Sequence, residues 1–385
     1  MKARFQYRFY PTDQQRQSLA QLFGCVRVVW NDALAICKQS DKKPKSAELQ
    51  KLVITQAKQT IERAWLSEVS NIPLQQSVAD LEVAFKNFFD SCKGKRKGRK
   101  VGHPKFKKRT NSQSARLTRG GFSFKGNGGV YLAKIGIVNP IWSRELPSDP
   151  SSVTVIKDGA NRYFLSFVVE IQPIQTERQN QSIGIDLGIK TFAVMSNGDR
   201  AESPSYKKLD RKVRKLQKKL ARQQKDSKRR NKTRTQIAKL NNLIADTRKD
   251  FLHKLSTKIV SENQTIVLED LNVSGMVKNR RLARAISQQG WYEFRSLCEG
   301  KSEKFGRDFR VISRWEPTSQ ICSDCGFRWG KLDLKVRSVQ CLNCGNEHDR
   351  DENAAKNINK VGTGHCHDCK RTQRQSKTTF GSVSR

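Results

Sequence analysis

Acidic residues are scarce in this sequence of 385 residues. Only 36 Asp and Glu stand against 75 Lys and Arg, so the formal net charge is +39. A charge of that size repels itself strongly unless a polyanion neutralises it. The imbalance therefore indicates that the partner of this protein is nucleic acid.

Long apolar runs are also missing. The longest stretch without a charged residue, residues 69–79, is short and half polar, whereas a membrane-spanning helix needs about 20 apolar residues. No apolar segment follows Met1–Arg4, so a secretion signal is not indicated either. These absences argue against a membrane partner and predict a cytosolic protein.

The hydrophobic residues of the chain suffice for a folded core. The hydrophobic fraction is only 36%, but it includes 18 Phe, 6 Trp and 6 Tyr. The length favours two or three domains. Ten cysteines are present, yet a cytosolic chain of this length is not expected to use them as a disulfide scaffold.

The first half of the chain predicts a helical insertion in a β-domain. Residues 5–9 alternate apolar and polar side chains, as in a half-buried strand. A capping box that begins at Thr12 starts a helical region, which continues to about residue 92. Strand patterns return over residues 122–170. Because the first strand has no nearby strand partner, we expect it to join this later sheet.

Two segments concentrate the positive charge. Residues 93–109 hold ten basic residues, no acidic ones and several Gly and Pro, which predicts a basic loop. Residues 206–260 hold twenty basic and four acidic residues around apolar positions spaced by three and four. That spacing predicts two long antiparallel helices. A solvated coiled-coil face is the alternative, but such a face normally mixes its charges, so we expect nucleic-acid contact.

Four cysteines form two C-x2-C pairs separated by fifteen residues: Cys322, Cys325, Cys341 and Cys344. A glycine follows each pair, and tight turns of this kind bring two sulfurs to one ion. Four thiolates complete the tetrahedron of a structural zinc ion. A redox pair or four unrelated buried cysteines account for the doubled spacing less well. For Cys366 and Cys369 in the tail, metal binding and an unstructured segment both remain open.

Three carboxylates stand out because acids are so few. Asp186 lies in the apolar strand pattern Ile183–Gly188, where the neighbouring glycines would leave room for a phosphate backbone and metal ions. Glu269 ends another apolar strand pattern, and Asp351 can cap a helix that begins at Glu352. Each acid alone could be a cap or a surface residue. Together they could form the oxygen cluster that Mg²⁺ requires.

Four ordered motifs resemble those of the TnpB family of transposon-encoded RNA-guided nucleases, relatives of the compact type V CRISPR effectors. The motifs are Ile183-Gly-Ile-Asp-Leu-Gly188, Val267-Leu-Glu-Asp-Leu271, Thr318-Ser-Gln-x-Cys322 with the following Cys325-Gly, and Asp349-Arg-Asp-x-Asn-Ala-Ala355. The resemblance covers residues 1 to about 362 and implies an α+β multidomain fold. A wedge-type β-barrel with an inserted helical recognition domain would precede a RuvC/RNase H-like α/β nuclease domain that carries a zinc ribbon.

The implied boundaries follow the motifs. They are 1–11 for the first strand of the barrel, 12–115 for the helical recognition domain with its basic loop, 116–180 for the rest of the barrel, 181–317 for the nuclease domain with its basic hairpin 206–260, 318–347 for the zinc ribbon, 348–364 for the final nuclease segment, and 365–385 for a disordered tail.

By motif match the resemblance assigns Asp186, Glu269 and Asp351 to the catalytic positions, with Asp349 as the alternative third ligand. The implied reaction is two-metal hydrolysis of a DNA phosphodiester next to a short flanking motif. Asp186 would bridge two Mg²⁺ ions about 3.5–4 Å apart, and the other two carboxylates would complete their shells. The single Zn²⁺ would be structural.

The resemblance also implies the partners: a guide RNA derived from the transposon end and double-stranded target DNA, with one protein chain per RNA. The location would be the prokaryotic cytoplasm, at the nucleoid when DNA is bound. The candidates for backbone contacts are Lys95, Arg96, Lys97, Arg99, Lys100, Lys107, Lys108, Arg109, Arg211, Lys215, Lys218, Lys219, Arg222, Arg229 and Arg230. Two alternatives stay open, namely a nuclease-inactive, guide-RNA-dependent DNA-binding regulator and a transposase in its own right.

Overall fold

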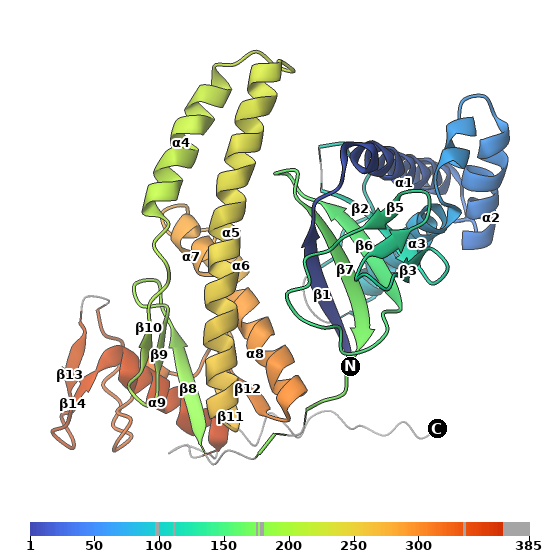
Figure 1. Cartoon of the computed structure of the whole chain (residues 1–385). Coiled ribbons are helices and arrows are strands. Elements are labelled where there is room, and N and C mark those ends of the chain that lie inside the picture. Colours follow the sequence, from blue (N-terminus) through green and yellow to red (C-terminus); the bar gives the residue numbers. More distant parts are fainter. Residues whose placement is uncertain (97–99, 111, 175, 178–180, 334–335, 365–385) are drawn as a thin grey trace. The chain divides into compact units, whose positions relative to one another are not determined.

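A computed structural model describes residues 1–96, 100–110, 112–174, 176–177, 181–333 and 336–364. Lys97 and Arg99 of the basic loop, and the tail 365–385 with Cys366 and Cys369, lie outside the described residues. The chain forms two compact units (Figure 1). The first comprises residues 1–171 and 219–239, and the second comprises residues 172–218 and 240–385.

The first unit contains a four-stranded antiparallel sheet in the order β1-β7-β6-β2, formed by β1 (Lys2–Phe9), β7 (Tyr163–Glu170), β6 (Ser152–Lys157) and β2 (Gln113–Thr118). Phe5 pairs with Phe167 in this sheet. The expectation that the first strand joins the later sheet is therefore confirmed. A second sheet contains β3 (Phe122–Phe124), β4 (Val130–Leu132) and β5 (Gly136–Val138). An isolated bridge from Phe9 to Pro140 links β1 to the segment after β5.

Helices fill the interval between β1 and β2. They are α1 (Asp13–Gln39), α2 (Ser46–Gln50), a π-helical turn (Lys51–Gln56), two 3-10 turns (Ala57–Gln59 and Ala64–Glu68) and α3 (Asn71–Cys92). The predicted capping box is present, because the backbone N–H of Gln15 donates to Thr12 Oγ1 at 3.3 Å and Thr12 N–H donates to Gln15 Oε1 at 3.0 Å. β2 begins at Gln113, two residues before the predicted end of the helical domain.

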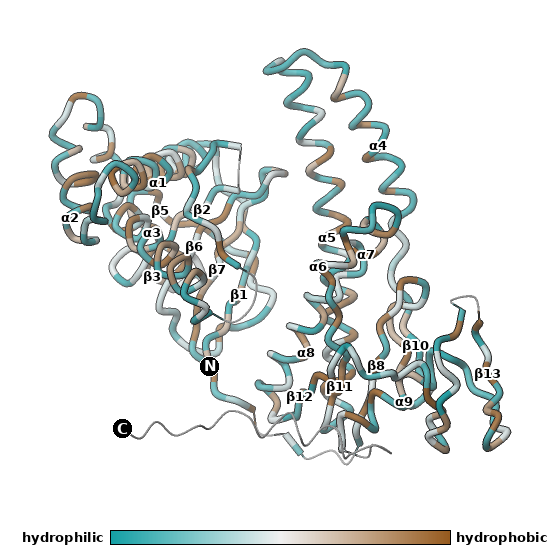
Figure 2. The backbone as a smooth tube through the Cα atoms, turned by 180° about the vertical axis from the view of Figure 1, so that it is seen from behind, coloured by the Kyte–Doolittle hydropathy of each residue, from teal (hydrophilic) through white to brown (hydrophobic). Residues whose placement is uncertain are grey.

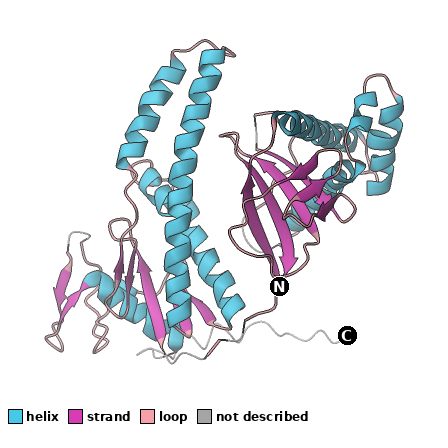
Figure 3. Ribbon diagram, viewed as in Figure 1, coloured by secondary structure: helices cyan, strands magenta, loops and turns pink. Residues whose placement is uncertain are grey.

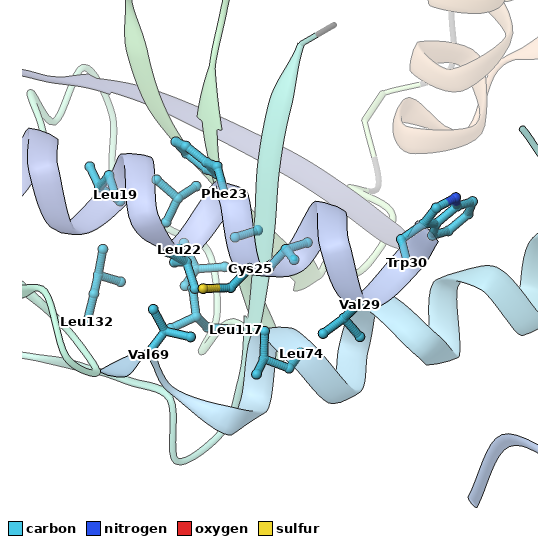
Figure 4. Packing of buried hydrophobic residues seen from close by; sticks show 14 of the residues in the cluster. Leu19, Leu22, Phe23, Cys25, Val29, Trp30, Val69, Leu74, Leu117 and Leu132 are labelled. Atoms are coloured by element: carbon cyan, nitrogen blue, oxygen red, sulfur yellow. The ribbon is translucent and has the colours of Figure 1, made fainter. Parts of the chain in front are cut away.

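The apolar face of α1 forms the centre of this unit. Leu19, Leu22 and Val29 are buried, and Leu74 of α3 and Leu117 of β2 pack with them in one cluster (Figure 4). Among the described helices, α1 alone is long and apolar enough to cross a membrane by length and composition, but half of its apolar window is buried in the protein. The predicted lack of such a segment was therefore too strict, although packing accounts for these apolar residues.

The second unit is built on a mixed five-stranded sheet in the order β10-β9-β8-β11-β12. Its strands are β8 (Ser182–Leu187), β9 (Ala193–Met195), β10 (Arg200–Ala201), β11 (Thr265–Glu269) and β12 (Asp308–Ile312). β11 is parallel to β8 and β12, whereas β9 is antiparallel to β8 and β10. Figure 2 shows the hydrophobic residues of β8 and β11 together in the core region of this unit.

Helices accompany these strands (Figure 3), and the part of them within residues 219–239 belongs to the first unit. They are α4 (Lys207–Ala221), α5 (Lys228–Glu262), α6 (Val273–Met276), α7 (Ala283–Gln289), α8 (Trp291–Phe305) and α9 (Arg350–Thr363). The predicted hairpin corresponds to α4 and α5. Gly290 separates α7 from α8, because it adopts the left-handed conformation at φ 74° between them.

Candidate active site and metal centre

The sheet brings two of the three predicted carboxylates to one edge. β8 and β11 are parallel neighbours, and Ile185 pairs with Leu268. Asp186 and Glu269 each follow directly after these paired residues. Because the carboxyl ends of parallel strands meet at the same edge, both acidic side chains lie at the end of the buried core.

Helix α9 carries the third carboxylate, and it crosses the sheet at a glycine. A Cβ atom on Gly184 would lie 2.3 Å from the carbonyl oxygen of Ala355 and 2.4 Å from the backbone nitrogen of Asn359. Only glycine allows this approach of β8 to α9. The expectation that Gly184 leaves room for phosphate or metal is therefore wrong, since the backbone of α9 fills that space.

The start of α9 also differs from the prediction. Asp349 is its N-cap, and its Oδ1 accepts hydrogen bonds from the backbone N–H groups of Asp351 and Glu352, both at 3.0 Å. Asp351 was expected to cap this helix, but it lies in the first helical turn. Its side chain is thus released from capping. Asp349 also forms a salt bridge with Arg200 at 2.9 Å.

The negative charges of Glu269 and Asp351 both act on Asp186. Burial raises the pKa of Asp186 to about 7, and the negative charges of Asp351 and Glu269 contribute to this rise, while Arg350 opposes it. Burial, followed by the charge of Asp270, also raises the pKa of Glu269. A raised pKa at Asp186 and Glu269 suits a cation, which would stabilise their ionised forms.

The other acids nearby behave in the opposite way. Hydrogen bonds from Arg314 and Arg295 hold the pKa of Asp270 below its usual range. Burial tends to raise the pKa of Asp349, but its cap hydrogen bonds and Arg200 outweigh this effect and lower it. Both residues are neutralised by protein groups, so they are poorer metal ligands than Asp186 and Glu269.

The ligand atoms of Asp186, Glu269 and Asp351 are not all within 4.8 Å of one another. Within the described ranges, the four cysteines are the only group of three or more His, Cys, Asp or Glu whose ligand atoms all lie within 4.8 Å of one another. Arg337 Nη1 lies 3.2 Å from Asp351 Oδ2 and forms an ion pair with it. The guanidinium of Arg337 thus provides positive charge where a cation would otherwise contact this carboxylate.

The sulfur atoms of the four cysteines all lie within 4.8 Å of one another. Sγ of Cys322 lies 3.8 Å from Sγ of Cys344, and Sγ of Cys325 lies 3.5 Å from Sγ of Cys341. Zinc–sulfur bonds of about 2.3 Å in a tetrahedron place the sulfurs about 3.8 Å apart, so the four thiols fit Zn²⁺. The glycine after each pair adopts positive φ, 77° at Gly326 and 74° at Gly345, and this closes each turn.

The cysteine ribbon is attached directly to the start of α9. β14 (Glu347–Asp349) pairs with β13 (Ser338–Gln340) of the ribbon and ends at the cap of α9. Buried His348 lies with its Nε2 3.1 Å from Cys322 Sγ. From α9, Asn353 accepts a hydrogen bond from Ser323 N–H at 2.7 Å and donates to Ile321 O at 2.7 Å. Neither His348 nor Asn353 was predicted, although an asparagine on a helix that follows a cysteine ribbon was a usable signal.

The candidate nucleic-acid contacts differ in accessibility. Those whose side chains are exposed are Lys95, Arg96, Lys100, Lys108, Arg109, Arg211, Lys215, Lys218, Lys219, Arg222 and Arg229. Lys107 instead lies over the ring of Trp30, 3.9 Å from its centroid, and burial lowers its pKa. Arg230 donates to the carbonyl oxygens of Leu220 and Gln223 at 2.7 and 2.8 Å, so it closes the turn of the hairpin.

Comparison with known proteins identifies the family. Three family models match: a helix-turn-helix domain over residues 1–45, a probable transposase over 166–280, and a Cas12f1-like TNB domain over 291–358. A protein of Streptomyces pristinaespiralis named "Putative RNA-guided DNA endonuclease" is 42% identical over 98% of this chain and 94% of its own length. The chain belongs to the TnpB family.

Two further comparisons agree with membership of the TnpB family. The Escherichia coli (strain K12) protein InsQ, which bears the same endonuclease name, is 30% identical over 93% of this chain and 92% of its own length. The protein in the cryo-EM structure of a Cas12f1–sgRNA–target DNA complex is 16% identical, with a TM-score of 0.50, over 90% of this chain and 81% of that chain. This likeness concerns the fold, and it confirms the multidomain α+β class expected for a TnpB protein.

A pair of substitutions distinguishes the two candidates for the third carboxylate. Asp349→Asn should preserve cleavage within a few-fold, because asparagine caps a helix as well as aspartate does. Asp351→Asn should reduce cleavage at least about 100-fold, because an amide is a weaker ligand for a hard cation. The rate of DNA cleavage under single-turnover conditions measures both effects. The reverse order would assign Asp349 as the third ligand.

Asp186→Asn should stabilise the magnesium-free protein. The pKa of Asp186 rises from 3.8 to about 7 on folding, so the folded state increasingly resists deprotonation as the pH rises from about 4 to 7. This rise lowers the free energy of unfolding of the wild type by at most about 4 kcal/mol above pH 7. The wild type regains that stability as the pH falls towards 4. In urea unfolding, the variant's advantage should be largest at pH 8 and small near pH 4. A pH-independent difference would contradict the assignment.

Proposed function

We propose that this protein is an RNA-guided DNA endonuclease that cleaves target DNA next to a short flanking motif and is associated with a transposable element. The main structural support is the position of Asp186 and Glu269 at the same end of two paired parallel strands. The negative charges of Glu269 and Asp351 also help to raise the pKa of buried Asp186, and such a site in a chain of charge +39 suits divalent cations. The Streptomyces relative, which bears an RNA-guided endonuclease name, supports the guide RNA as partner.

Asp186, Glu269 and Asp351 would hold the catalytic ions. Bound Mg²⁺ would activate the attacking water and stabilise the leaving oxygen of the phosphodiester. Asp186 provides a carboxylate fixed on a central strand, and Glu269 provides a second on the neighbouring strand. Arg337 can leave Asp351 without losing its own charge, since guanidinium stays protonated. The guanidinium of Arg337 would then be free to contact a phosphate of the DNA.

The four cysteines would hold one Zn²⁺ with a structural role. All four thiolates are used for one tetrahedron, so no ligand position remains for water. The ribbon reaches the start of α9 through His348 and Asn353. Zinc would therefore stabilise the segment that presents Asp351.

Helix α4 provides the clearest surface for a nucleic-acid backbone. Arg211, Lys215 and Lys218 are exposed and follow one another by four and three residues, which places them along one face of the helix. Exposed Arg222 continues this stripe directly after α4 ends at Ala221. Adjacent like charges destabilise an isolated helix. A polyanion along this stripe would remove that repulsion.

Binding to double-stranded DNA or guide RNA should weaken steeply as salt increases. Replacing the four stripe residues with glutamine should make the slope of log K against log salt shallower by about three to four for duplex DNA, because each neutralised phosphate contributes about 0.9. A variant that exchanges Arg for Lys and Lys for Arg at the same positions keeps the charge and should keep the slope. Equal slopes in the glutamine variant and wild type would exclude the stripe.

Copurified RNA tests the proposed function against its alternatives. A guided nuclease should purify with one defined RNA and cleave DNA in Mg²⁺. RNA without cleavage would favour the DNA-binding regulator. Cleavage or strand transfer without a bound RNA would favour a transposase, the description carried by the family model over residues 166–280.

A further inference from the structure

Two aromatic side chains of the second unit are unusually exposed. Trp315 has 86% of its surface exposed and Tyr292 has 75%, and no other aromatic residue in the described ranges exceeds the 66% of Tyr10. Aromatic side chains normally bury about 150–250 Å² each and dominate the interfaces they join. Two such rings in solvent therefore offer a large apolar surface to a ligand.

Each ring lies near an arginine that forms a salt bridge with Asp270, and we call this pair of salt bridges the ionic clamp. Arg295 Nη1 donates to Asp270 Oδ1 at 2.7 Å, and Arg314 Nε donates to Asp270 Oδ2 at 3.1 Å. Trp315 directly follows Arg314. Tyr292 precedes Arg295 by three residues on α8, which places the two side chains about one helical turn apart on the same face. The Asp270 carboxylate thus joins the two segments that carry these rings.

The clamp lies at the carboxylate edge of the sheet. Asp270 follows Glu269, and Glu269 pairs with Ile312 in the neighbouring strand. Trp315 is three residues beyond Ile312, so their Cα atoms are at most about 11 Å apart. The turn between them is held by hydrogen bonds from Glu316 N–H to Ser313 O at 3.1 Å and from Trp315 N–H to Ser313 Oγ at 3.3 Å.

We propose that Trp315 and Tyr292 form a stacking platform for the bases of single-stranded DNA beside the carboxylates. Rings stack on any base, so the platform would hold a strand without reading its sequence. Paired bases are already stacked on their neighbours, which makes an unpaired strand the matching ligand. Two arginines against one carboxylate leave positive charge for the adjoining phosphate. The inference rests on the proposed function, because that function brings DNA to this edge.

The test uses the full-length protein with its copurified RNA. The probe is a single-stranded DNA oligonucleotide that carries 2-aminopurine, whose fluorescence falls when the base stacks, with Ca²⁺ in place of Mg²⁺ to prevent cleavage. Trp315→Ala should remove most of the quenching and weaken binding about 5- to 100-fold, the range for one lost stack. Trp315→Phe should retain most of both effects. Leu342→Ala removes a side chain that is 87% exposed on the ribbon and should change neither.

An abasic site in the oligonucleotide makes the test specific. At the stacked position, removing the base should weaken binding to the wild type but add little to the defect of Trp315→Ala. An equal loss in both proteins at every position, or unchanged quenching in a Trp315→Ala/Tyr292→Ala variant, would overturn the platform. Quenching by a protein that cannot cut DNA would contradict the proposed function and leave the platform standing.

Discussion

Asp186→Ala is expected to reduce DNA cleavage at least about a thousandfold, which corresponds to about 4 kcal/mol of transition-state stabilisation. The substitution removes the carboxylate that lies on the central strand and feels both Asp351 and Glu269. The affinity for guide RNA and DNA should stay within a few-fold of the wild-type value, because the basic side chains that would contact the nucleic-acid backbone lie elsewhere in the chain. Single-turnover cleavage and filter binding measure the two quantities separately.

Asp199→Ala provides a matched control, since Asp199 is a half-exposed acid of the same unit whose salt bridge to Lys258 is long, at 4.0 Å. It should cleave at the wild-type rate. Comparable cleavage by Asp186→Ala and wild type in Mg²⁺ would refute the carboxylate assignment. A parallel loss of binding would instead indicate a folding defect, which circular dichroism would reveal.

Cys322→Ser is expected to release zinc and to lower cleavage at least about 100-fold. Structural zinc sites contribute folding free energy of about 10 kcal/mol or more in isolated zinc-finger peptides. Without zinc, His348 and β14 would lose their anchor, and the first turn of α9 would no longer hold Asp351 in place. Zinc content by atomic absorption and amide hydrogen exchange over residues 318–352 report these changes without relying on activity.

Cys92→Ser serves as the control for zinc loss, because Cys92 is exposed and lies outside the four-cysteine cluster. Its zinc content, exchange pattern and cleavage should match the wild type. Full cleavage by a Cys322→Ser protein that has lost its zinc would show that the ribbon does not position Asp351.

Local patterns in the sequence predicted most of the elements around the site. The alternation at Phe5, Tyr7 and Phe9 was sufficient to predict both a strand and its distant pairing, because that strand had no local partner. The four-cysteine cluster was predictable because a doubled C-x2-C spacing is typical of a four-thiolate metal site and of little else. The carboxylates were found by their scarcity in a basic chain and by motif resemblance.

The parts that were missed depend on contacts between distant segments. Gly184 was interpreted as room for a ligand, whereas its role is to admit the backbone of α9, which begins more than 160 residues later. Asp351 was interpreted as a cap because both Asp349 and Asp351 precede an apolar helix, and only the backbone geometry decides between them. The packing of Lys107 over the ring of Trp30, which makes it a poor candidate for a free cation, was likewise invisible in the sequence.

Guided cleavage tests the central claim most directly. The RNA that copurifies with the wild-type protein is sequenced, and its variable end is used to build a plasmid that carries the complementary target within a library of flanking sequences. We expect Mg²⁺-dependent cleavage of that plasmid next to one short flanking motif, no cleavage of a scrambled target, and no cleavage by Asp186→Ala. Cleavage that ignores the RNA sequence, or an intact matched target in the presence of bound RNA and Mg²⁺, would contradict the claim that this protein is a guided nuclease.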